Sequence, residues 1–325
     1  MAKITMVEAL TQAMAWEMEH DESVVVLGED VGVNGGVFRA TVGLQEKFGK
    51  ERVVDTPLAE ALIAGVSIGM AAQGLKPVAE IQFSGFIYPT VDQMINHAGR
   101  LRNRTRGRLH VPMVLRAPSG GGIHAPEHHS ESNEAMFAHM PGIRVVMPSS
   151  PRRAYGLLLA AIRDPDPVVF LEPTRLYRMN KQEVADDGEA LPLDTCFVLR
   201  EGADVTLVTW GAMVHESLQA AQQLADEGVD VEVIDLATVS PIDFETILES
   251  VEKTGRLVVV HEAPKTCGVG AEIAAEVAGK GIYDLKAPIQ RVTGYDTPIP
   301  LFKMEHDYMP GVDRIKRAIK TTLEG

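Results

Sequence analysis

The sequence has few cysteines, an excess of acidic residues and no long apolar run. Only Cys196 and Cys267 occur in 325 residues, with no CxxC motif, so no disulfide framework is expected and a reducing cytoplasm fits best. Lysine and arginine total 31 against 45 aspartates and glutamates, which gives a net charge of -14. Because a negative field repels nucleic acid and anionic lipid, neither is an expected partner.

Several sequence signals are also missing. The N-terminal residues lack the basic stretch and apolar run of a signal peptide, and no segment approaches the roughly 18 apolar residues of a membrane span. Neither GxGxxG nor GxxxxGK(S/T) occurs, and the nearest approach, GVGAEI at 268–273, lacks the third glycine. A secretory leader, a membrane span and a dinucleotide or nucleotide site are therefore not predicted.

The first half of the sequence alternates short apolar runs with longer helical patterns. Strands are expected at 24–27, 78–83, 113–116 and 144–147, and helices at 6–19, 57–74, 91–102 and 154–163. This alternation predicts a parallel sheet covered by helices.

The alternation restarts after a polar, charged and aperiodic stretch at 180–192, which is the expected connection between domains. Strands are then expected at 205–209, 231–236, 257–261 and 289–292, and helices at 215–226, 244–254 and 271–278. Because 325 residues exceed the usual span of one core, the predicted fold class is α/β with two doubly wound domains, 1–185 and 186–325.

Glu60 is the one ionisable residue in the expected helix at 57–74, which should be buried on all sides. The simplest interpretation is an acid favoured by the helix macrodipole. Capping explains Glu60 poorly, because it lies four residues after Thr56 rather than three. An apolar environment would instead favour the protonated acid, which can donate a hydrogen bond to an aromatic ring nitrogen.

Two glycines on the same helix, Gly65 and Gly69, are one turn apart and leave a bare strip where another backbone can approach. Helices are expected to cross there, at a subunit interface. Together with Glu60, Val66 and Met70, these glycines resemble the signature of thiamine diphosphate enzymes. In that family the glutamate contacts a nitrogen of the cofactor's aminopyrimidine and promotes the imino tautomer from which the reactive ylid forms.

Further motifs extend the resemblance over essentially the whole length. They are GEDVG at 28–32, GGVFRAT at 35–41, DTPLAE at 55–60, EIQF at 80–83, PSGGG at 118–122, HHSES at 128–132, DPVVFLEP at 166–173 and TGYDTPIP at 293–300. Together they resemble the beta subunits of the first, decarboxylating component of 2-oxo acid dehydrogenase complexes. The resemblance implies a pyrimidine-binding thiamine diphosphate domain followed by a transketolase C-terminal-like domain.

The implied enzyme is an oxidoreductase that decarboxylates a 2-oxo acid and transfers the acyl group to the lipoyl group of a dihydrolipoyl acyltransferase. Pyruvate is favoured, because GVNGGVFRAT at 32–41 and HAPEHHSES at 124–132 look closest to pyruvate-type chains. A branched-chain 2-oxo acid or acetoin dehydrogenase beta subunit remains an alternative, as does half of a split transketolase-like enzyme.

Three histidines, His124, His128 and His129, follow a glycine-rich turn. Local hydrogen bonding is the simplest interpretation for His124 and His128. A metal pair of these two is disfavoured, because Pro126 between them opposes a helical arrangement. By resemblance, His129 matches the family's active-site histidine, which stabilises charge near the substrate and assists proton transfer during reductive acylation.

The resemblance also implies two sets of ligand-binding residues. Gln82 and Phe86 are expected to line the aminopyrimidine pocket, unless they serve ordinary core and hydrogen-bonding roles. Asp164 and Asp166 can be turn residues beside prolines, but related chains wrap a potassium ion there. The matching backbone carbonyls belong to Met113, Ala161, Ile162, Asp164 and Asp166.

The GDG motif that holds Mg²⁺ and the diphosphate in such enzymes is absent. The resemblance implies that an alpha subunit supplies this half of the site, so that thiamine diphosphate lies between chains of an α2β2 heterotetramer. A non-catalytic assembly protein is the rival from another class, but it would not need a lone acid in an apolar helix.

Overall fold

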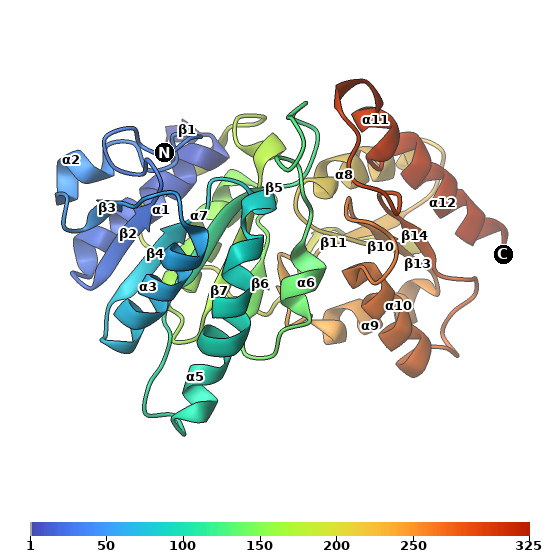
Figure 1. Ribbon diagram of the computed structural model, residues 1–325. Helices are drawn as coiled ribbons and strands as arrows, with labels where there is room; N and C mark the ends of the chain where they lie inside the picture. Colours follow the sequence, from blue (N-terminus) through green and yellow to red (C-terminus); the bar gives the residue numbers. More distant parts are fainter. Residues whose placement is uncertain (1) are drawn as a thin grey trace. The chain divides into compact units, whose positions relative to one another are not determined.

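The computed structural model describes residues 2–325, and the chain divides into two compact units (Figure 1). Unit 1 contains the residues up to Ser119 together with Met136–Leu193, and unit 2 contains Gly120–Ala135 together with Asp194–Gly325. The boundary expected between 185 and 186 stays a prediction. The structure adds a feature that no sequence pattern indicated, because a short segment from the first half of the chain belongs to unit 2.

Unit 1 is built on a sheet whose strands from this unit lie in the order β6-β7-β5-β4-β2-β3, all paired in parallel. The strands are β2 (Val24–Gly28), β3 (Val53–Asp55), β4 (Lys76–Glu80), β5 (Val114–Ser119), β6 (Arg144–Val146) and β7 (Val168–Pro173). β2, β5 and β7 are buried along their whole length, as expected of parallel strands covered on both faces. A separate antiparallel pair joins β1 (Ala2–Ile4) to β8 (Gln182–Val184).

Helices cover both faces of this sheet. In Figure 1, α1 and α7 lie together against one face, while α3 lies against β4 on the other. α1 begins with a capping box between Thr5 and Glu8, and Ser150 caps α7. The helices and turns of this unit are α1 (Met6–His20), α2 (Leu44–Phe48), α3 (Glu60–Ala72), η1 (Ser84–Phe86), η2 (Tyr88–Thr90), α4 (Val91–Gln93), η3 (Met94–Ala98), α5 (Gly99–Arg104), α7 (Pro151–Arg163) and η4 (Thr174–Leu176).

The expectation for the helix at 57–74 is wrong in two respects. α3 begins at Glu60 rather than at the proline, and it is not buried on all sides. Leu62 and Val66 are each 45% exposed, and Gly69 is exposed beside them. We call these three residues the open face of α3. An all-apolar composition identifies a helix that is buried somewhere, but it does not tell whether the same chain or another one covers it.

Unit 2 is a second doubly wound domain with strand order β14-β13-β10-β11-β9, in which only the pairing of β9 is antiparallel among the described residues. The strands are β9 (Phe197–Arg200), β10 (Val205–Thr209), β11 (Val231–Asp235), β12 (Thr238–Ser240), β13 (Leu257–Val260) and β14 (Gln290–Val292). The helices and turns that begin in this unit are α6 (Glu134–Ala138), α8 (Met213–Ala225), α9 (Phe244–Thr254), α10 (Val269–Lys280), η5 (Phe302–Met304), α11 (Glu305–Tyr308) and α12 (Val312–Glu324).

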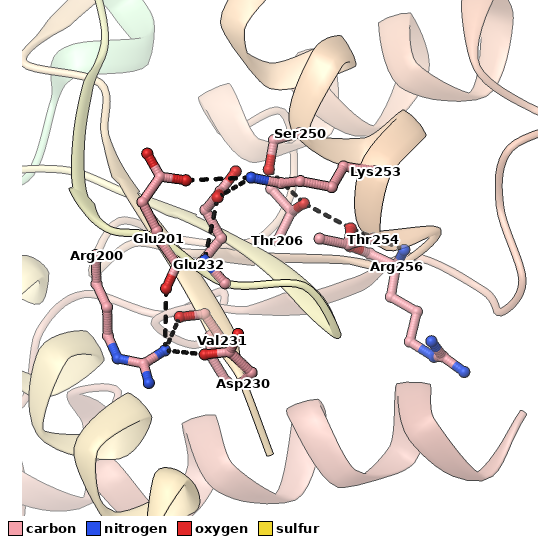
Figure 2. Close-up of polar contacts among 11 residues, drawn as sticks. Arg200, Glu201, Thr206, Asp230, Val231, Glu232, Ser250, Lys253, Thr254 and Arg256 are labelled. Carbon is pink, nitrogen blue, oxygen red and sulfur yellow. Dashed lines mark hydrogen bonds and ion pairs between the residues drawn. The ribbon is translucent and has the colours of Figure 1, made fainter.

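A polar network closes the end of this sheet where β10 and β11 begin (Figure 2). The ammonium group of Lys253 pairs with the buried Glu232 and, at 3.3 Å, with Glu201. Burial alone would raise the pKa of Glu232, but hydrogen bonds from Lys253 and from the Gly202 N–H hold it below its usual range. Thr206 completes the network with hydroxyl contacts to α9. This end of the sheet is therefore sealed by internal hydrogen bonds.

Within residues 2–325, no helix is long and apolar enough to cross a membrane.

Candidate functional site

One candidate site lies in unit 1, where β2 ends and α3 begins. Glu29 directly follows β2, and Glu60 is the first residue of α3, whose N-cap Ala59 makes no side-chain cap hydrogen bond. Both glutamates are half-buried. Burial, followed by the negative charges of Glu60 and Asp30, raises the pKa of Glu29. The carboxyl groups of Glu29 and Glu60 are therefore near enough for the charge of Glu60 to act on Glu29.

Sequence reasoning missed Glu29. The position of Glu29 in the sequence could have indicated a role in ligand binding. Glu29 follows β2 immediately, and ligands of doubly wound sheets bind at the carboxyl ends of the strands. The first-turn position of Glu60 also remains compatible with a favourable helix dipole.

An aromatic wall follows β4. Gln82 and Phe86 are both half-buried, and Phe86 ends the turn η1. The Phe83 ring meets Phe86 edge to face at a centroid distance of 5.7 Å and meets Phe38 at 5.2 Å. The arrangement offers aromatic faces beside an amide group, which suits a flat heterocycle with ring nitrogens.

A buried ionic cluster lies under this wall. The Arg116 guanidinium donates to Glu80 at 2.8 Å and to both carboxyl oxygens of Glu172, at 2.7 and 3.0 Å. Tyr177 donates its hydroxyl to Glu172 and packs against the Phe38 ring. Burial raises the pKa of Glu80, and Arg116 only partly opposes this shift. The cluster ties β4, β5 and β7 together at the end of the sheet that bears Gln82.

Of the two glycines Gly65 and Gly69 on α3, only Gly65 lies next to another part of this chain. A Cβ added at Gly65 would make an ordinary contact of 3.5 Å with Gln93, and one added at Gly69 would meet nothing within 4 Å. Packing within the chain therefore does not explain why position 69 is glycine.

A second candidate site is the segment Gly120–Ala135 of unit 2, which we call the histidine loop. His129 is half-buried, and its Nδ1 lies 2.8 Å from the Glu127 carbonyl oxygen. His124 and His128 are exposed, have positive φ angles, and lie 3.5 and 3.9 Å from the carboxylates of Glu305 and Glu131. Both histidines thus have a carboxylate neighbour within unit 2, and their expected local hydrogen bonding stays a prediction.

Two buried carboxylates hold the histidine loop, and sequence reasoning missed both. Glu305 accepts the N–H groups of Gly122 at 2.7 Å and His124 at 2.9 Å. Glu262 accepts the N–H of Gly121 at 2.9 Å. Glu262 follows the buried strand β13 almost directly, which was the only sequence signal for its position.

Two of the residues expected around potassium, Asp164 and Asp166, lie in one turn. Their side chains form hydrogen bonds and ion pairs with other residues of the chain. Asp164 accepts the Asp166 N–H at 2.8 Å and an Arg144 N–H at 3.2 Å, and Asp166 pairs with Arg102 at 2.6 Å. Asp166 also borders a cavity of about 420 Å³. Because arginines neutralise both carboxylates, a potassium site would have to use backbone carbonyls, as predicted.

The other expected potassium ligands are main-chain groups. The Met113 carbonyl accepts the Val168 N–H at 2.9 Å, and Ala161 and Ile162 lie in the last turn of α7, where carbonyls lack helical partners. No group of three or more histidine, cysteine, aspartate or glutamate side chains within residues 2–325 is arranged to hold a metal. The potassium site stays a prediction.

Comparison with known proteins gives the same architecture. Residues 2–180 match the family model "Transketolase, pyrimidine binding domain", and residues 194–315 match "Transketolase, C-terminal domain". A solved structure described as "Split gene transketolase, inactive beta4 tetramer" covers 99% of both chains with a TM-score of 0.81 at 22% identity, which shows the fold alone.

Curated relatives are similar over their full length. The "Pyruvate dehydrogenase E1 component subunit beta" of Acholeplasma laidlawii is 53% identical over 320 residues, which are 98% of each chain. The protein of the same name from Bacillus subtilis is 49% identical over 324 residues, which are 100% of each chain.

The fold and the two matched domains define a transketolase-like α/β protein. Within that class, the chain belongs to the family of beta subunits of the pyruvate dehydrogenase E1 component. The predicted fold class, the predicted family and the predicted oxidoreductase class are thereby confirmed. The roles of Glu60, His129, Gln82 and Phe86 stay predictions.

Proposed function

We propose that this chain forms, with an alpha subunit, a thiamine-diphosphate-dependent enzyme that decarboxylates pyruvate and passes the acetyl group to the lipoyl group of a dihydrolipoyl acyltransferase. The observation that carries this proposal is the position of Glu60, the half-buried first residue of α3, which follows β3 at the carboxyl end of the parallel sheet. Full-length relatives named for pyruvate dehydrogenase support pyruvate over a branched-chain acid or acetoin.

The residues present fit the aminopyrimidine half of thiamine diphosphate. A carboxyl group suits a ring nitrogen, the rings of Phe83 and Phe86 suit a flat heterocycle, and the Gln82 amide can both donate and accept hydrogen bonds. When bound, the cofactor supplies the nucleophilic carbon and the electron sink for the decarboxylation.

The chain's own residues bind, orient and hold protons. The Glu60 carboxyl would hydrogen-bond a nitrogen of the aminopyrimidine and assist proton movement there when the cofactor is bound. Phe86 restricts the orientation of the ring and excludes water from this hydrogen bond. His129 stabilises negative charge on the substrate and donates a proton while the acetyl group is transferred.

The remaining half of the site is assigned to the partner. We propose that an alpha subunit supplies Mg²⁺ and the diphosphate contacts, that the assembly is an α2β2 heterotetramer, and that the open face of α3 packs against another subunit. Three observations support this: apolar side chains on that face are exposed, Gly69 is unused within the chain, and the sequence lacks a GDG motif. Potassium would bind the carbonyls named above.

We also propose a cytoplasmic location. Both cysteines are free thiols, one buried and one exposed, which fits a reducing compartment.

The test is Glu60→Gln, which keeps the shape of the side chain but removes its acidic proton. Turnover of pyruvate by the assembled enzyme should fall about 10²- to 10⁴-fold, since the variant loses a general acid and base. Glu51→Gln, at an exposed acid in the same unit, is the matched control. Near-normal turnover by a folded Glu60→Gln enzyme would contradict the proposal.

A further inference from the structure

The sheet of unit 2 has a topological switch point between β10 and β13. The chain passes from β10 through α8 to β11 on one side, and then through α9 to β13 on the other side of β10. In doubly wound sheets, a crevice opens at the carboxyl ends of the strands at such a point, and it is where ligands bind. The residues that follow these strands are Trp210 after β10, and His261 and Glu262 after β13.

These strand-end residues bind a segment of the chain itself. Glu262 accepts the Gly121 N–H at 2.9 Å near the start of the histidine loop, and the Trp210 Nε1–H donates to Glu134 at 3.3 Å near its end. The Trp210 ring is stacked on His261 at a centroid distance of 5.0 Å, which fixes the direction of its N–H. The histidine loop is thus anchored at both ends at the switch point.

Glu305 holds the first part of the loop, after Gly121. Its two carboxyl oxygens take the Gly122 and His124 N–H groups, and its side chain is 2% exposed. Hydrogen bonds from backbone N–H groups to a buried carboxylate are stronger than neutral ones. They fix the backbone a few residues before His129.

The glycines at the start of the histidine loop have no room for a side chain. A Cβ added at Gly120, where φ is +83°, would lie 2.5 Å from a Glu262 carboxyl oxygen, and one added at Gly121 would lie 2.3 Å from the Ile299 side chain. These glycines are therefore needed for the close contact with Glu262 and Ile299, as well as for the backbone conformation of the turn.

We propose that unit 2 uses its strand-end crevice to position the histidine loop, with Glu305, Glu262 and Trp210 as positioning residues for His129. The inference rests on the function proposed for His129. In this proposal, unit 2 contributes to the reaction by holding the imidazole of His129 in place. Such positioning matters because a displacement of about 1 Å can lower the rate about 10²-fold.

The test is Glu305→Gln in the full chain, with amide hydrogen exchange measured along the sequence. The glutamine keeps one acceptor oxygen but turns an NH₂ group toward the second N–H, so one hydrogen bond is lost. The amides of Gly122 and His124 should exchange at least about tenfold faster, and the core strands should not change. Glu272→Gln, at an exposed acid of α10, is the matched control.

The same variants are then assembled with the alpha partner, and the two half-reactions are assayed separately. Acetyl transfer should fall more than decarboxylation, while the thermal midpoint stays near that of the wild type. If Glu305→Gln does not fold, Trp210→Phe keeps an aromatic ring beside His261 but removes the indole N–H together with part of the ring, and it should loosen the loop near Glu134.

The possible outcomes separate this inference from the function proposed for His129. Unchanged exchange in the histidine loop would overturn the anchoring, whatever His129 does. A loosened loop with normal acetyl transfer would overturn the positioning role. Failure of the His129 proposal itself shows in a different variant, His129→Ala, with normal rates in both half-reactions.

Discussion

Gly69→Ala should strengthen the isolated chain and weaken its assembly. Within the chain, an added Cβ at this position meets nothing within 4 Å, and Gly69 lies inside α3. Alanine is better than glycine in a helix interior by about 1 kcal/mol, so the lone chain should become more stable by roughly that amount. If another subunit's backbone crosses at Gly69, the same methyl group overpacks the interface at a cost of about 1–3 kcal/mol.

That cost corresponds to an association between the subunits that meet at Gly69 that is about 5- to 150-fold weaker. Denaturant unfolding of the lone chain measures the first effect, and sedimentation of mixtures with the alpha subunit measures the second. Gly279→Ala is the matched control, because Gly279 is an exposed glycine of α10 whose added Cβ also meets nothing within 4 Å. An assembly of normal affinity from Gly69→Ala chains would refute the proposed crossing at this residue.

Three further predictions follow from the site and the core. His129→Ala should lower acetyl transfer at least as much as decarboxylation, and His124→Ala should have a milder effect in the same two half-reaction assays. The lone chain should bind Mg²⁺ and thiamine diphosphate weakly in titration calorimetry, because it lacks a diphosphate site; tight binding and turnover without the alpha subunit would contradict the shared site. Burial and, secondarily, the charge of Arg291 lower the pKa of His261 from 6.5 to about 4. Between these two pH values the unfolded chain binds more protons than the folded chain. The free energy of unfolding should therefore fall by about 3 kcal/mol as the pH drops from 6.5 to 4. His261→Phe should flatten this part of the stability profile, and an unchanged slope would assign the pH dependence to other groups.

The arrangement of strands and helices was largely predictable, because each element carries its own apolar period. The strand expected at 113–116 shows where this reasoning stops. The expected strand ends at Arg116, but β5 continues to Ser119 with Arg116 buried inside it. The strand tolerates the guanidinium because Glu80 and Glu172, which lie 36 and 56 residues away in sequence, neutralise it. No local pattern contains that information.

The candidate site was predictable to a similar degree. Glu60 and His129 stand out in sequence because motifs surround them. The open face of α3 could not be predicted, because its exposure depends on which chain covers the helix. Glu29, Glu262 and Glu305 could not be predicted either, because their roles depend on contacts between segments that are distant in sequence.

The anchoring of the histidine loop has a consequence for the order in which the newly made protein matures. Glu305 lies 181 residues after His124, so a ribosome that adds about 5–20 residues per second completes the loop roughly 10–40 s before it makes the carboxylate that holds it. Trp210 and Glu262 are made within that interval, so the two ends of the loop can be held first, while the backbone at Gly122 and His124 still lacks its carboxylate. The hydrogen bonds that fix the backbone before His129 therefore form only after Glu305 has been translated, long after the loop itself.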